Sequence, residues 1–270
     1  MERYQVILAY DGSHYKGFQR QAHAPSVQAV VEEALHRLNW RGKSILAAGR
    51  TDTGTHATGQ VIAFDLDWEH GPHDLQTAMN AYLPPDVVAR DVREVNGTFH
   101  PRHDASWRRY NYRIYCQPVR QPLLEPYAWR VWPAVDVAQL DKTAQLFIGT
   151  RDFGAFGTPP QPGGSTIRMV HESGWNEEAP YLVFDIAAQA FLYHMVRRIV
   201  FMQIAIAQGK QTNASLETAL KNGVDPGLSD GQAEKSAQRM VHGLAPAHGL
   251  ILAEVHYRQE CLQLSEDKKY

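Results

Sequence analysis

The order of apolar periodicities along residues 4–95 constrains the fold more than any other feature of the sequence. Apolar runs and alternation predict strands over 4–10, 44–48, 59–65 and 87–95. Ser26 is a suitable N-cap for a helix through Leu38, and a second helix over 74–83 is stopped by Pro84. Strand, helix, strand, strand, helix, strand is the ferredoxin-like order. We therefore expect an α+β domain over residues 1–105.

The same order roughly repeats after residue 105. Strands are predicted over 109–116, 127–132, 166–175, 181–187 and 250–257, and helices over 135–148 and 191–208. This order predicts a second α+β domain over 106–258, again with mostly antiparallel strands. Residues 225–238 are expected to be irregular or partly helical, and 259–270 to form a polar tail.

Composition narrows the class of protein. The chain has 270 residues, of which 44% are hydrophobic, enough for a sizeable core. Neither a leader peptide nor a membrane-spanning apolar run is found, so a cytoplasmic location is expected. Cys116 and Cys261 lie far apart, which favours neither a disulfide framework nor a zinc site. The histidines show no helical pair at metal spacing, and Gly42-Lys43-Ser44 lacks the upstream glycine of a phosphate loop.

One segment is much more basic than the net charge of −2 suggests. Between Arg102 and Arg130 there are six arginines against two acidic residues, with six tryptophans and tyrosines interleaved. Guanidinium groups suit phosphates and aromatic faces suit unstacked bases, so the segment fits RNA binding. A strand with one solvated basic face would show the same composition.

Residues 49–57, Gly-Arg-Thr-Asp-Thr-Gly-Thr-His-Ala, join two predicted strands. This context predicts an irregular loop that exposes Asp52 at the edge of a sheet. Arg50 stands two residues before it and Gly54 two residues after it. A turn that only holds its own backbone would also contain Asp, Thr and Gly, so the loop alone leaves both interpretations open.

The whole string resembles the catalytic loop of the tRNA pseudouridine synthase A family, Gly-Arg-Thr-Asp-x-Gly-Val-His-Ala. Thr55 stands where that pattern usually has Val. Further blocks resemble the family in the same order and span nearly the full chain, namely Tyr10-Asp11-Gly12, Ser26-Val27-Gln28, Leu83-Pro84, Phe99-His100, Arg108-Arg109-Tyr110, Asp152-Phe153, His194-Met195-Val196-Arg197 and Gly249-Leu250.

This resemblance implies both a fold and an activity. The fold would be that of the pseudouridine synthases, with two ferredoxin-like or RRM-like halves and an active-site cleft between them. The activity would be isomerisation of uridine to pseudouridine at positions 38, 39 and 40 in the anticodon stem-loop of tRNAs, by a homodimer without cofactor or metal.

The reaction breaks a C1′–N1 bond and forms a C1′–C5 bond, for which an ionised carboxylate next to the base suffices. Asp52 is the candidate nucleophile, and Arg50 or Arg197 could keep it ionised. The resemblance implies that Arg197 is the active-site cation and that Tyr110 stacks on the target base, where its hydroxyl could relay the C5 proton. Arg198 and Phe201 stand where the family more usually has Asn and Gly.

Six cations are candidate substrate contacts in addition to Tyr110, although any single one could be an ordinary surface charge: Lys16, Arg20, Arg50, Arg102, Arg108 and Arg168.

Two other classes of protein share some of these features. Asp52-Thr53-Gly54 is the local signature of aspartic proteases, but those enzymes need two carboxylates and this long chain has one copy of the motif. A non-catalytic RNA-binding module could use the same arginines and aromatic residues. Such a module has no use for a carboxylate in its RNA groove, where the negative charge repels phosphate. We therefore predict an RNA isomerase.

Overall fold

The computed structural model describes residues 1–221 and 240–262, so the expectations for 225–238 and for 263–270 lie outside the described residues. The chain divides into two compact units. Unit 1 comprises residues 1–108 and 251–262. Unit 2 comprises the described residues between them, 109–221 and 240–250. The division falls three residues after the expected boundary at 105. Residues 251–258, expected in the second domain, belong to unit 1.

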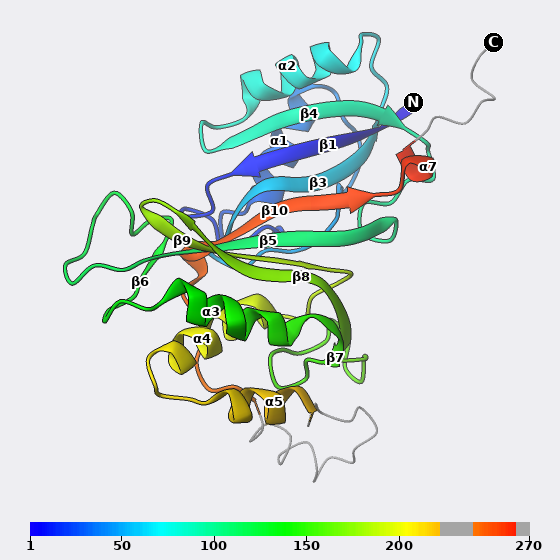
Figure 1. Cartoon of the computed structure of the whole chain (residues 1–270). Helices are drawn as coiled ribbons and strands as arrows, with labels where there is room; N and C mark the ends of the chain where they lie inside the picture. The colour runs from blue at the N-terminus through cyan, green and yellow to red at the C-terminus, as the bar shows by residue number, and fades with distance from the viewer. Residues whose placement is uncertain (222–239, 263–270) are drawn as a thin grey trace. The chain divides into compact units, whose positions relative to one another are not determined.

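The described residues of unit 1 form strands and three helices (Figure 1). Its elements in chain order are β1 (Glu2–Tyr10), α1 (Val27–Arg37), β2 (Leu46–Ala47), β3 (His56–Leu66), α2 (Pro72–Tyr82), β4 (Val87–Val95), β10 (Leu250–Tyr257) and α7 (Gln259–Leu262). The strand order is β4-β1-β3-β10, and the short β2 also pairs with β3. All these pairs are antiparallel except β3 with β10, which is parallel.

The core of unit 1 follows from two periodicities. Tyr4, Val6 and Leu8 recur at every second residue of β1 and are buried. On α1, buried Val27, Val31 and Leu35 recur at helical spacing. The Ser26 hydroxyl accepts a hydrogen bond from the Ala29 amide, which confirms the predicted N-cap.

Unit 2 combines further strands with helices (Figure 1). Its elements are β5 (Ala105–Tyr115, which begins in unit 1), β6 (Trp129–Arg130), α3 (Val137–Ala144), the 3-10 turn η1 (Gln145–Phe147), β7 (Gly149–Asp152), β8 (Ile167–Glu178), β9 (Tyr181–Ala188), α4 (Met195–Ala207), α5 (Asn213–Lys221) and the 3-10 turn η2 (Ala247–Gly249). The strand order is β5-β9-β8-β7, and α3 packs on β8 and contacts α4.

The α+β class and the mostly antiparallel pairing are confirmed. Three helices differ from the prediction, since α7 (Gln259–Leu262) lies within the residues that were expected to form a polar tail. The helix predicted over 191–208 begins only at Met195, because His194 has a left-handed backbone with a φ of 66°. The helix α5 was not predicted, because its polar surface and short length give little periodic signal.

Candidate active site

The loop that carries Asp52 is a tight turn between β2 and β3. The Thr55 amide donates to the Asp52 carbonyl oxygen at 3.1 Å, and Gly54 has a φ of 75°. A turn of this kind favours glycine at the position with positive φ. Asp52 is partly exposed, so its carboxylate can be reached by a substrate. The predicted context of strand, loop and strand is confirmed.

The segment from Tyr10 to Phe18 holds this turn from the side. The Phe18 amide donates to the carbonyl oxygen of Thr51 at 3.1 Å, and the hydroxyl groups of Tyr10 and Thr51 are hydrogen-bonded at 2.8 Å. Gly17, with a φ of 95°, lies so close to the turn that a Cβ atom at this position would be 2.7 Å from the Thr51 carbonyl oxygen. Backbone and side chain thus fix the residue that precedes Asp52 in the chain.

His56 fixes the other end of the turn. The Gly12 amide donates to His56 Nδ1 at 3.0 Å, so Nδ1 acts as an acceptor and a neutral ring carries its proton on Nε2. Asp11 Oδ1 is 3.1 Å from the same nitrogen. No role was predicted for Tyr10, Asp11 and His56 from the sequence. The only signal for them was that they stood within blocks that resemble the family.

Thr55 explains why one departure from the family pattern is tolerated. Its side chain has the shape of valine and is 1% exposed, and its hydroxyl has no hydrogen-bond partner among the described residues. The oxygen atom therefore occupies a site built for a methyl group.

In unit 2, Tyr110 and Arg197 belong to one packed region. Tyr110 meets Phe191 edge to face, with the ring centroids 5.0 Å apart. Tyr112 follows Tyr110 by two residues and lies on the same face of β5. Its hydroxyl donates to the Pro246 carbonyl oxygen at 2.7 Å. Arg197 Nε donates to the carbonyl oxygen of Ala245, the residue before Pro246, at 2.8 Å. Burial raises the pKa of Tyr112, and the positive charge of Arg197 opposes this shift.

The six candidate substrate cations differ in their surroundings. Lys16, Arg50 and Arg102 are exposed. Arg20 instead pairs with Glu32, which is 2% exposed, at 2.6 Å. Arg108 donates to three carbonyl oxygens, the nearest being that of Arg102 at 2.6 Å. Arg168 donates to the Ser165 and Ile167 carbonyl oxygens, and burial lowers the pKa of its guanidinium group.

The basic segment between residues 102 and 130 is less cationic than its composition indicates. Arg109 pairs with Asp185 and with Glu172, the latter at 2.7 Å. Arg113 lies over the Tyr181 ring at 5.3 Å from its centroid, and Arg130 is 3.8 Å from Glu125. Acids from other parts of the chain thus balance Arg109, which sequence composition could not show.

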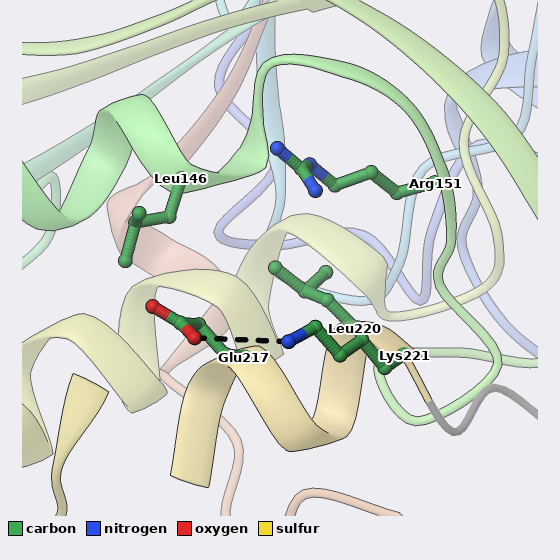
Figure 2. A pocket seen from close by; sticks show the side chains of 5 residues that line it. All are labelled: Leu146, Arg151, Glu217, Leu220 and Lys221. Atoms are coloured by element: carbon green, nitrogen blue, oxygen red, sulfur yellow. Dashed lines mark ion pairs between the residues drawn. The ribbon is translucent and has the colours of Figure 1, made fainter. Parts of the chain in front are cut away.

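A pocket of about 160 Å³ in unit 2 contains none of the candidate residues (Figure 2). Leu146, Leu220 and Arg151 line it together with Glu217 and Lys221, which are 4.0 Å apart. The part of the chain that the structure describes contains no group of three or more His, Cys, Asp and Glu residues able to hold a metal ion. None of its helices is long and apolar enough to cross a membrane.

A family model described as tRNA pseudouridine synthase matches residues 6–104 and 143–258. Asp52 and Arg197 lie within the matched residues, and Tyr110 lies outside them. The chain is 34% identical to tRNA pseudouridine synthase A of Geobacillus kaustophilus, over 97% of this chain and 96% of the relative. It is 39% identical to the Shewanella frigidimarina protein of that name, over 77% of this chain and 80% of the relative.

The protein of the same name from Aeromonas salmonicida is 40% identical, over 77% of each chain. Among solved structures, a chain titled "Crystal Structure of a Cbf5-Nop10-Gar1 Complex" overlaps with a TM-score of 0.35 at 12% identity. That overlap covers 75% of this chain and 44% of the other, and it is too weak to support a conclusion.

Proposed function

Because this chain belongs to the tRNA pseudouridine synthase family, we propose that it converts uridine to pseudouridine at positions 38, 39 and 40 in the anticodon stem-loop of tRNAs. The reaction takes place in the cytoplasm and needs no cofactor. The observation that carries the proposal is the position of Asp52, an accessible carboxylate on a turn that hydrogen bonds hold on both sides.

Asp52 is the nucleophile. Attack at C6 of the uracil or at C1′ of the ribose would each free the base to turn, so that C5 can bond to C1′. A glycal route would use the same carboxylate. A turn fixed through Thr51 and His56 suits such a role, because a reacting group gains most from being held in place before the substrate arrives.

Tyr110 and Arg197 act on the same uridine. The Tyr110 ring, held edge to face by Phe191, offers a surface for the flipped base, and its hydroxyl can relay the proton that leaves C5. Arg197 is the cation of the active site. Its Nε bond to Ala245 fixes the direction of the guanidinium group.

The exposed cations Lys16, Arg50 and Arg102 bind the phosphates of the tRNA, together with Arg108 and Arg168. Arg20 contributes through the part of its guanidinium group that Glu32 leaves accessible, since its side chain is 50% exposed. Phosphate contacts of this kind set affinity and position, and they leave the choice of uridine to the groups around Asp52.

The test is Asp52→Asn, which is nearly isosteric and removes the negative charge. We expect no pseudouridine in tRNA incubated with this variant, while tRNA affinity is equal to that of the wild type or slightly higher. Asp67→Asn, at a side chain that is 90% exposed, serves as the matched control and should be fully active. Tritium release from tRNA labelled at uracil C5 measures turnover.

The rival classes give different results in the same assay. A non-catalytic RNA-binding module releases no tritium even with the wild-type chain. An aspartic protease cleaves peptides without RNA, and Asp52→Asn abolishes the cleavage. Pseudouridine formation by purified Asp52→Asn, with reversion to Asp excluded by mass spectrometry, would show that Asp52 is not the essential group.

The active form is a homodimer, in which one subunit holds the body of the tRNA while the other modifies it. An L-shaped tRNA extends further than a compact chain of 30.4 kDa, so a two-fold assembly would supply the missing contact surface. Mixing Asp52→Asn with an RNA-contact variant such as Arg102→Ala should restore activity. A monomer in sedimentation at working concentration, with no complementation, would exclude this assembly.

A further inference from the structure

Two segments of unit 2, residues 156–158 and 193–198, form a surface that has no role in the proposed chemistry apart from Arg197. The Tyr193 amide donates to the Thr158 carbonyl oxygen at 2.9 Å, and Arg198 Nη1 donates to the Phe156 carbonyl oxygen at 3.3 Å. Gly157 packs so tightly that a Cβ atom there would be 2.6 Å from the Tyr193 carbonyl oxygen. The surface is therefore firmly held.

An aromatic pair stands on this surface. The Tyr193 side chain is 57% exposed, and its ring stacks on that of His194 with the centroids 3.7 Å apart. A single exposed tyrosine is ordinary. An exposed ring that stacks on a second ring is already held in one orientation. A base can therefore stack on its free face without the entropy cost of ordering the side chain.

A cation without an acidic partner lies next to this pair. Arg198 is half-buried, and within the described residues no carboxylate pairs with it. Burial lowers the pKa of Arg198, the neighbouring charge of Arg197 lowers it further, and only the Tyr193 side chain acts in the opposite direction. An anion bound here would offset both the burial and the repulsion.

We infer that Tyr193 and Arg198 form a subsite for one nucleotide of the RNA substrate, with its base on the Tyr193 ring and its phosphate on the Arg198 guanidinium group. Phe191, two residues before Tyr193, contacts Tyr110, and Arg197 immediately precedes Arg198. The nucleotide is therefore a neighbour of the target uridine. This inference rests on the proposed function and specifies the substrate contacts of the same enzyme.

Arg198→Asn tests the phosphate contact, because it removes the positive charge and leaves a smaller polar side chain that can still donate a hydrogen bond. Binding of an anticodon stem-loop RNA is measured over a series of salt concentrations. We expect affinity to fall about tenfold at low salt and the slope of log K against log salt to shrink by about 0.7, the value of one single-stranded phosphate contact. Arg198→Lys should retain most of the slope.

Tyr193→Ala and Tyr193→Phe test the base contact. Stacking requires the ring and not the hydroxyl, so Ala should weaken binding about tenfold while Phe binds like the wild type. Both changes lie at an exposed side chain, so the fold should survive. Arg37→Ala, which removes an exposed arginine paired with Glu33, controls for the loss of one positive charge.

Wild-type affinity and salt slope in both Arg198→Asn and Tyr193→Ala would overturn the subsite. A loss in Arg198→Asn equal to that in Arg37→Ala would overturn the phosphate contact as well, because it would reflect net charge alone. The tritium-release assay on the wild-type chain keeps the two claims separate. If the wild type forms pseudouridine and these variants bind RNA like the wild type, the proposed function is supported and the subsite inference is wrong.

Discussion

Two threonines of the Asp52 loop have opposite surroundings. The Thr51 hydroxyl is hydrogen-bonded to that of Tyr10 at 2.8 Å, whereas the Thr55 hydroxyl is buried and has no partner in the part of the chain that the structure describes. An unpaired buried hydroxyl costs about 1–3 kcal/mol. We predict that Thr55→Val raises the free energy of unfolding by about 1 kcal/mol and leaves turnover unchanged, as measured by urea denaturation and tritium release.

Thr51→Val is the matched change and should have the opposite sign. It leaves the Tyr10 hydroxyl without this partner and lowers the free energy of unfolding by about 1–3 kcal/mol. Turnover should fall as well, since Thr51 precedes Asp52 and its carbonyl oxygen accepts from Phe18. Equal stability of the two variants would mean that hydrogen bonding of these hydroxyls does not control the loop.

The accessible carboxylate of Asp52 could be predicted from sequence because it depends on local chemistry. Apolar runs on both sides predict strands, and Gly54 predicts a turn between them. The hydrogen bond from Gly12 to His56 could not be predicted in this way. It joins residues separated by 44 positions, and nothing in local spacing specifies such a pair.

Helix α1 is tied to its flanking segments by one buried carboxylate. Glu32 accepts hydrogen bonds from Arg20, from Gln28 and from the Ile45 amide. We predict that Arg20→Ala lowers the free energy of unfolding by about 1–2 kcal/mol, because it leaves Glu32 buried with one partner fewer. Lys16→Ala, at an exposed cation of the same loop, should leave stability unchanged. Thermal unfolding measures both.

This comparison also separates structural from RNA-binding roles. If Arg20→Ala weakens tRNA binding without loss of stability, its contact with Glu32 is dispensable and phosphate binding is its main role. The sequence shows Arg20 as a free surface cation. Its pairing becomes visible only in the folded chain, because the burial of Glu32 depends on which face of α1 packs inward.

Helix α4 begins after a residue in a left-handed conformation. His194 has a φ of 66°, which costs a non-glycine residue about 1–2 kcal/mol. We predict that His194→Gly is at least as stable as the wild type, because glycine adopts this backbone without strain. His194→Val should be less stable by about 1 kcal/mol, because a β-branched side chain fits it worst. Urea denaturation of the three proteins checks the order.

The apolar character of residues 195–206 made α4 predictable, but it did not predict the residue at which the helix begins. The sequence Phe191-Leu192-Tyr193-His194 continues the apolar run, so periodicity extends the helix to 191. Tyr193 instead forms an isolated antiparallel bridge with Thr158, and His194 follows with a left-handed backbone. A contact across 35 positions thus overrides local preference.

Both ends of the described chain build unit 1. Strand β10 returns after unit 2 and pairs in parallel with β3, with Ile251 opposite His56 and Leu252 opposite Ala57. The sequence predicted β10 as a strand but placed it in the second domain, because alternation alone does not identify the partner of a strand. His56 thus joins three parts of the chain, namely the Asp52 turn, Gly12 and β10.

The close approach of β3 and β10 depends on Gly59. A Cβ atom there would be 2.2 Å from the Ala253 carbonyl oxygen, which the backbone cannot accommodate without moving. We predict that Gly59→Ala separates β10 from β3 while the pairing of β1 with β3, as at Val6 and Ile62, persists. Amide hydrogen exchange should then speed up at Leu252 but not at Val6.

Gly97→Ala is the control, because no atom lies within 4 Å of the position that its Cβ would occupy. Turnover should also fall in Gly59→Ala, since the loss of β10 frees the strand that begins at His56, directly after the Asp52 turn. Faster exchange in β10 with normal turnover would show that the C-terminal strand stabilises unit 1 without positioning Asp52. Unchanged exchange at Leu252 would show that the two strands can shift to accept the methyl group while remaining paired.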